Sequence, residues 1–268
     1  MKRLAHAVLV LAVFAVAARM QSLAVHVPGY RELYDRFPFY VPEGLRSVAE
    51  VLLVFVVVAA MHRLGPAGVL RELGLRRRPF RGLVFAMLAA LPLWAVFAAT
   101  MPVASDLDPW AVAYLAGLSP LAEEVVFRAF AFGQLRRRLG WGFWWAALVP
   151  ALIFGLVHLR PGQGPGEMAG VFLITGAGAL LFSFVYERWG WDLWAAWGLH
   201  AVMNLAWNLF QVGDSALAGW LPTTMQAVTA GTAVALTLWR NRLPLLGKRD
   251  DEPAVTGGVV SSGRRRPR

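Results

Sequence analysis

The chain has 268 residues, of which 58% are hydrophobic and 16% charged, with 12 tryptophans and no cysteine. A soluble domain is nearer half apolar and a quarter charged, so this composition is typical of a membrane protein. The absence of cysteine excludes a disulfide framework, a thiol nucleophile and a cysteine-ligated metal. The formal net charge is +10. Because the basic residues lie between apolar runs, this charge favours membrane orientation over a nucleic-acid partner.

Eight apolar segments follow one another, each long enough for a membrane-spanning helix of about 20 residues. We expect them at about residues 4–27, 45–64, 80–101, 110–135, 141–159, 167–188, 191–212 and 220–240. The sequence therefore predicts an all-α, polytopic transmembrane helix bundle of about eight spans. This bundle would form a single domain over residues 1–247. Residues 248–268, rich in Gly, Ser, Pro and Arg, are predicted to be a disordered basic tail on the cytoplasmic side.

Basic and non-basic gaps alternate along the chain. The gaps after the second and fourth segments and the tail are rich in arginine, whereas "ASDLDP" and "QVGDSALAG" are neutral or acidic. The positive-inside rule then predicts that both termini are cytoplasmic, which an even number of spans satisfies. The high Ala, Arg, Gly and Trp content is typical of a GC-rich bacterial genome, so we expect the bacterial cytoplasmic membrane. The first segment is interpreted as an uncleaved span, although its "AVA" also resembles a signal-peptide cleavage site.

Ionisable groups inside spans are costly to bury and by default indicate a functional site. The polar residues within the segments are Arg19, Glu50, Glu123, Glu124, Arg128, His158 and His200, with Asn204 as a neutral companion. Arg19 and Glu50 lie toward segment ends, where side chains reach the membrane interface, so a structural role is expected for both. The remaining residues form regularly spaced sets, which favours a functional role.

The stretch "SPLAEEVVFRAF", residues 119–130, holds three charges in apolar surroundings. On a helix, Glu124 and Arg128 are four residues apart in the order that favours an ion pair. Glu123 is offset by about 100° around the helix and has no cation at helical spacing. This leaves Glu123 available as a general base. The alternative is that the ion pair only locks two helices together while Glu123 stays protonated and inert.

Two further sets lie in later segments. In "FGLVHL", Phe154 and His158 share one helix face, and in "HAVMNL", His200 and Asn204 do so. A lone histidine in a span is more often a packing group than a catalyst. Convergence of three helices on one polar cluster, however, would let each buried group find a partner. We therefore expect these sets to meet near Glu123.

The order Glu-Glu-x-x-x-Arg, Phe-x-x-x-His and His-x-x-x-Asn resembles the CPBP intramembrane protease family, which includes the CAAX prenyl endopeptidases and bacterial proteins of bacteriocin-processing and immunity type. The resemblance covers about residues 110–210, and it implies a protease core at about 110–212. It implies an endopeptidase that cleaves membrane-associated proteins or peptides. Its implied catalytic residues are Glu123, Glu124, His158, His200 and Asn204, with Arg128 and Phe154 as orienting residues.

Within that resemblance, Glu123 and His158 would bind and activate a water molecule, while His200 and Asn204 would donate hydrogen bonds to the oxyanion. A metal-free, glutamic-type mechanism is favoured, because there is no H-E-x-x-H motif and asparagine is an unusual zinc ligand. A zinc-dependent metalloprotease, with Glu123, His158 and His200 as ligands, is the first alternative. A non-catalytic immunity or transport protein of the same fold is the second. The expected partners are membrane lipid and a membrane-associated substrate, with no nucleic acid.

Overall fold

The computed structural model describes residues 2–77, 79–160, 164–213 and 215–242, and every regular element within them is a helix. The predicted tail from residue 248 lies outside the described residues. The elements are α1 (Lys2–Ala18), α2 (Met20–Ala24), α3 (Glu32–Arg36), α4 (Tyr40–His62), α5 (Pro66–Glu72), α6 (Pro79–Thr100), α7 (Pro109–Ala113), η1 (Tyr114–Leu118), α8 (Ser119–Glu123), η2 (Glu124–Phe132), η3 (Gln134–Arg138), α9 (Phe143–Val157), α10 (Pro165–Arg188), α11 (Leu193–Leu209), α12 (Trp220–Trp239) and η4 (Arg240–Arg242).

The all-α fold class is confirmed, and each of the eight predicted segments coincides with a helix or a continuous helical run. Among the described residues, four helical stretches are long and apolar enough to cross a membrane, namely Tyr40–His62, Pro79–Thr100, Pro109–Arg138 and Pro165–Arg188. Two further apolar helices, α1 and α9, are shorter. These apolar helices indicate a multi-pass membrane protein, and the count of eight spans stays a prediction.

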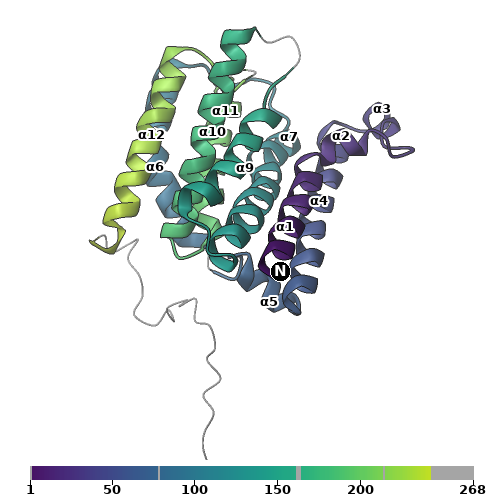
Figure 1. Ribbon diagram of the computed structural model, residues 1–268. Coiled ribbons are helices and arrows are strands. Elements are labelled where there is room, and N and C mark those ends of the chain that lie inside the picture. The colour runs from purple at the N-terminus through teal and green to yellow at the C-terminus, as the bar shows by residue number, and fades with distance from the viewer. Residues whose placement is uncertain (1, 78, 161–163, 214, 243–268) are drawn as a thin grey trace, which may run out of the picture.

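The helical run from residue 109 to residue 138, which we call the central run, lies in the middle of the bundle. It packs against α1, α4, α9, α10 and α11. Figure 1 shows α1 and α4 on one side of it, and α6, α10, α11 and α12 on the other. All residues of η2 are buried, including two charged ones. The element with the most burial therefore carries Glu124 and Arg128, and Glu123 directly precedes it.

Parts of the central run are wound more loosely than an α-helix. The backbone N–H of Gly133 donates to the carbonyl of Arg128, and that of Leu139 donates to the carbonyl of Gln134, in each case five residues back. Such π-helical turns are rare and frequently occur at functional sites. The apolar pattern predicted the helix here, but it did not predict this winding.

Helices α6 and α11 approach each other closely at a glycine. A Cβ atom placed on Gly82 would lie 2.5 Å from the carbonyl carbon and oxygen of Trp194, closer than side-chain atoms come to backbone. Across the same contact, Gly198 faces the Gly82 carbonyl. This packing seats α11, which carries His200 and Asn204, between α6 and the central run.

Candidate active site

A buried ion pair forms the base of the site. Glu124 Oε1 lies 3.2 Å from Arg128 Nη1, and the two side chains are 0% and 1% exposed. The ion pair predicted from their spacing is thus confirmed. The guanidinium also lies over the rings of Phe154, at 4.5 Å from the ring centroid, and Phe182, at 5.1 Å. Aromatic faces attract such a cation, so Arg128 is held by a carboxylate and by two rings.

Glu124 has a second partner on another helix. The same oxygen, Oε1, lies 2.9 Å from Nδ1 of His200 on α11. An ionised carboxylate only accepts hydrogen bonds, so this contact places a proton on Nδ1 and fixes the ring orientation. The imidazole also stacks on Phe182 with 5.0 Å between ring centroids. Glu124 therefore orients His200 as well as neutralising Arg128.

Glu123 is placed differently from its neighbour. Its side chain is 28% exposed, and Oε2 lies 3.9 Å from Nε2 of His200, beyond hydrogen-bond range. Its other oxygen, Oε1, accepts a hydrogen bond of 3.1 Å from the hydroxyl of Ser119. Among the described residues, Oε2 has no hydrogen-bond partner. One oxygen is thus occupied, and the other faces an imidazole nitrogen.

His158 and Asn204 lie at the edges of this arrangement. His158 directly follows α9, with its ring 4.3 Å from that of Phe154 and its Nδ1 2.7 Å from the Phe154 carbonyl oxygen. Its polar contact in the described chain is therefore with its own helix end and not with Glu123. Asn204 Nδ2 donates to the Leu115 carbonyl at 3.2 Å, which ties α11 to the central run.

The predicted residues are therefore brought together unequally. Glu123, Glu124, Arg128 and His200 form one contact cluster, as the sequence led us to expect. Phe154 connects His158 to that cluster, because its ring also lies 6.5 Å from the ring of His200. Asn204 lies on α11 with His200, and it contacts the central run at Leu115, one helical turn before Ser119.

The three zinc ligands of the metal-dependent alternative do not meet at one point among the described residues. Three ligands within one coordination sphere are the minimum for a catalytic zinc. The described part of the chain contains no group of three His, Cys, Asp or Glu side chains that could hold a metal ion. Glu123, His158 and His200 instead contact Ser119, Phe154 and Glu124 respectively, and the zinc-dependent alternative stays a prediction.

Comparison with known proteins agrees with the three motifs. Residues 104–206 match the model of the family described as Type II CAAX prenyl endopeptidase Rce1-like. We call this matched segment the Rce1-like domain. The match confirms the resemblance to the CPBP family, and every predicted site residue lies within the matched range.

One curated relative matches part of the chain. An 87-residue stretch is 31% identical to "Putative membrane peptidase YdiL" of Bacillus subtilis (strain 168). The alignment covers 32% of this chain and 31% of that protein, so it spans about a third of the relative's length. No solved structure matches the chain.

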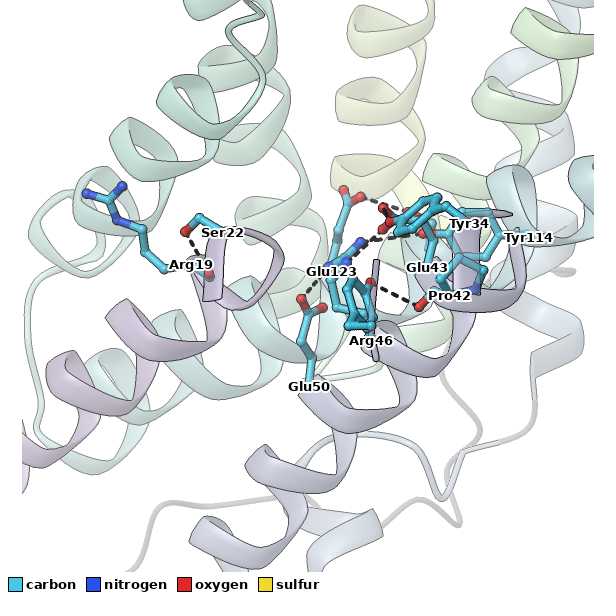
Figure 2. A network of polar contacts seen from close by, with 11 residues as sticks. Arg19, Ser22, Tyr34, Pro42, Glu43, Arg46, Glu50, Tyr114 and Glu123 are labelled. Carbon is cyan, nitrogen blue, oxygen red and sulfur yellow. Dashed lines mark hydrogen bonds and ion pairs between the residues drawn. The ribbon is translucent and has the colours of Figure 1, made fainter. Parts of the chain in front are cut away.

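A polar network on α4, outside the Rce1-like domain, was not predicted from the sequence. Arg46 Nε lies 2.7 Å from Glu43 Oε2, and Arg46 also pairs with Glu50. Glu50 was expected near the membrane interface. In the structure it lies in the middle of α4, and it is buried, with 6% of its surface exposed. Figure 2 shows this network together with Glu123. The spacing of three and four residues between these charges was the signal that could have identified it.

Proposed function

We propose that this chain is an intramembrane endopeptidase that hydrolyses peptide bonds in membrane-associated proteins or peptides. The contrast between the two adjacent glutamates supports this proposal most directly. Glu124 is fully buried and engaged by Arg128 and His200, whereas Glu123 is partly exposed and keeps one carboxylate oxygen free of protein partners among the described residues. The match to an endopeptidase family supports the same conclusion.

In the proposed reaction, Glu123 acts as the general base. Glu123 Oε2 lies 3.9 Å from His200 Nε2, and because Oε2 is buried in this structure, the attacking water reaches it only after neighbouring side chains move. Glu123 takes a proton from this water as its oxygen attacks the carbonyl carbon of the scissile peptide. When the C–N bond breaks, the protonated Glu123 returns the proton to the departing amine.

The negative charge that develops on the carbonyl oxygen needs donors in a dry, preorganised site. We assign this role to His200 and Asn204. Asn204 Nδ2 uses one hydrogen for the Leu115 carbonyl and retains a second. His200 already shares its Nδ1 proton with Glu124, so donation from Nε2 requires a doubly protonated ring. His158 is assigned to the water beside Glu123, which requires its ring to turn from the Phe154 carbonyl during the reaction.

The wider proposal is that all eight apolar helical stretches cross the membrane with both termini in the cytoplasm. Supporting it, Figure 1 shows the N-terminal end of α1, the short helix α5 and the C-terminal end of α12 at the same end of the bundle. Arginines gather there, at positions 71, 77, 136–138, 240 and 242. The positive-inside rule assigns such an end to the cytoplasm.

Replacing the proposed base tests the function. Glu123→Gln keeps the size of the side chain and removes the base, so we expect cleavage to fall by about 10²–10⁴-fold. Quantitative proteomics of membrane-protein termini, in cells that express either form, would reveal termini that depend on Glu123. The matched control is Glu187→Gln, which changes a surface carboxylate paired with Arg136 and should leave these termini unchanged. Identical termini for wild type and Glu123→Gln would contradict the proposal.

A further inference from the structure

The Ser119 hydroxyl binds one carboxylate oxygen of Glu123, so the other oxygen is the one that faces His200. The hydroxyl lies one helical turn before the carboxylate and donates to Oε1 at 3.1 Å. Oε2 is consequently the oxygen that faces His200, at 3.9 Å. Without the hydroxyl, rotation about the last side-chain bond would exchange the two oxygens at little cost, because terminal sp³–sp² torsions are broad. A hydroxyl that donates to a carboxylate also favours its charged form.

Ser119 is itself connected to α4. The Tyr114 side chain lies beside those of Ser47 and Ser119, and Tyr114 is 8% exposed. Arg46 Nη2 lies 3.5 Å from the Tyr114 oxygen. Arg46 is in turn held by two carboxylates of its own helix. Polar side chains thus extend from Glu123 toward α4, and Figure 2 shows Glu123, Tyr114 and Arg46 among them.

We propose that Ser119 is a positioning residue for Glu123, and that Tyr114 and Arg46 anchor this pair to α4. The proposal rests on the proposed function in that Glu123 is taken as the general base. Ser119 would touch neither substrate nor water; it would hold the carboxylate in the geometry that proton transfer requires. The anchoring by Tyr114 and Arg46 would also make α4, which lies outside residues 104–206, a contributor to the site.

The protonation of Glu123 can be measured without a substrate. Dicyclohexylcarbodiimide modifies protonated carboxyl groups in apolar surroundings, and mass spectrometry of the purified full-length protein reads labelling at Glu123 as a function of pH. The charges that act on this carboxyl include Glu124, His200, Arg128 and Glu50, and all stay in place in the variants. We expect Ser119→Ala to move the labelling midpoint to higher pH, because the carboxylate loses a donor.

Three further variants make this measurement decisive. Ser119→Thr retains the hydroxyl and should restore the wild-type midpoint. Tyr114→Phe removes only the next hydroxyl and should move the midpoint in the same direction by less. Ser183→Ala is the matched control, because Ser183 is buried on α10 and its hydroxyl donates to the Ala179 carbonyl of its own helix, at 2.9 Å. Its midpoint should equal that of the wild type.

Kinetics on a peptide that spans a Glu123-dependent cleavage site, found by terminal proteomics, gives the second readout. Ser119→Ala should lower kcat about tenfold, the value of one hydrogen bond to a charged group. KM should stay unchanged, and the acidic limb of the rate profile should move to higher pH. Wild-type labelling and wild-type rates in Ser119→Ala would overturn the positioning role. Equal cleavage by wild type and Glu123→Gln would instead overturn the proposed function, while the labelling midpoint still decides the role of Ser119.

Discussion

Adjacent glutamates in one helix have different surroundings because consecutive residues point in different directions around it. Glu124 faces the interior between Arg128 and His200, and its side chain is 0% exposed. Glu123 faces the accessible side, and only a serine hydroxyl among the described residues donates to it. The same side chain therefore serves as a structural counter-ion at one position and as a candidate base at the next.

This difference predicts opposite effects of the same substitution. Glu124→Gln removes the counter-charge of a buried guanidinium, and breaking a buried ion pair costs about 3–5 kcal/mol. We expect the variant to lose stability and activity together. Glu123→Gln should lose activity while the free energy of unfolding stays close to the wild-type value. Unfolding in mixed detergent micelles, followed by tryptophan fluorescence, measures the free energy of unfolding of both variants.

A double variant separates charge from packing. Glu124→Gln combined with Arg128→Met removes both charges, and an apolar replacement of a buried pair is often neutral or stabilising. We expect the double variant to regain most of the lost stability and none of the activity, because His200 still lacks its carboxylate. If Glu124→Gln alone were as stable as the wild type, the structural role assigned to Glu124 would be wrong.

At the scale of elements, apolar runs were sufficient to predict the long helices, since burial and a membrane interior both select long apolar stretches, but they did not predict the short helices α3 and α5. The motifs also singled out Glu123, Glu124, Arg128 and His200, which the structure brings into one cluster. The sequence did not reveal the π-helical winding. The same apolar pattern fits a helix whose backbone hydrogen bonds join residues four apart and one whose bonds join residues five apart. The sequence did not reveal the role of Arg46 either, because the fold alone brings α4 beside the Rce1-like domain.

A second carboxylate joins two elements at the opposite end of the central run. Glu72, the last residue of α5, accepts a 2.9 Å hydrogen bond from Arg138 Nε and lies 2.8 Å from Arg137 Nη2. Burial raises the pKa of Glu72, but the Arg138 hydrogen bond and the charges of Arg137 and Arg138 outweigh it and lower the pKa to about 2. This carboxylate therefore fastens α5 to η3 while it is ionised.

The direction of this shift fixes the pH range in which the contact stabilises the fold. In the unfolded chain the pKa of Glu72 is near its ordinary value of 4.5, and in the folded chain it is about 2. The stabilisation, about 3 kcal/mol, is then fully present above pH 4.5 and is lost as the pH falls toward 2. We expect Glu72→Gln to be less stable than the wild type at pH 7, with the difference vanishing in that acidic range.

The matched control for this prediction is Glu187→Gln. Glu187 pairs with Arg136 at 2.9 Å, but the two side chains are 22% and 33% exposed. Exposed pairs contribute about 0–1 kcal/mol, so the control should change stability little at any pH. A constant stability difference between wild type and Glu72→Gln from pH 7 to pH 2 would show that the contact acts through packing and not through charge.

At the scale of the whole molecule, the open question is which helices cross the membrane. Helix α1 has 17 residues and α9 has 15, which at 1.5 Å per residue gives lengths of about 23–26 Å. The hydrocarbon core of a bilayer is about 30 Å thick. A shorter helix crosses by local thinning of the bilayer at a modest cost. Helix α11 also has 17 residues, so the proposed topology depends on these three helices.

Because the chain has no cysteine, single cysteines can report each side of the membrane without background. The proposed topology predicts that Val27→Cys, Ser105→Cys and Gly164→Cys react with a membrane-impermeant maleimide in intact cells. Ala67→Cys and Arg242→Cys should react only after the membrane is permeabilised. All five positions are exposed in the structure, so absence of labelling reports the side of the membrane and not burial. Gly164 follows α9 and Val27 follows α1, so their labelling tests these two helices directly. If Gly164→Cys were protected in intact cells while Ser105→Cys reacted, α9 would not cross, and the eight-span arrangement would be wrong.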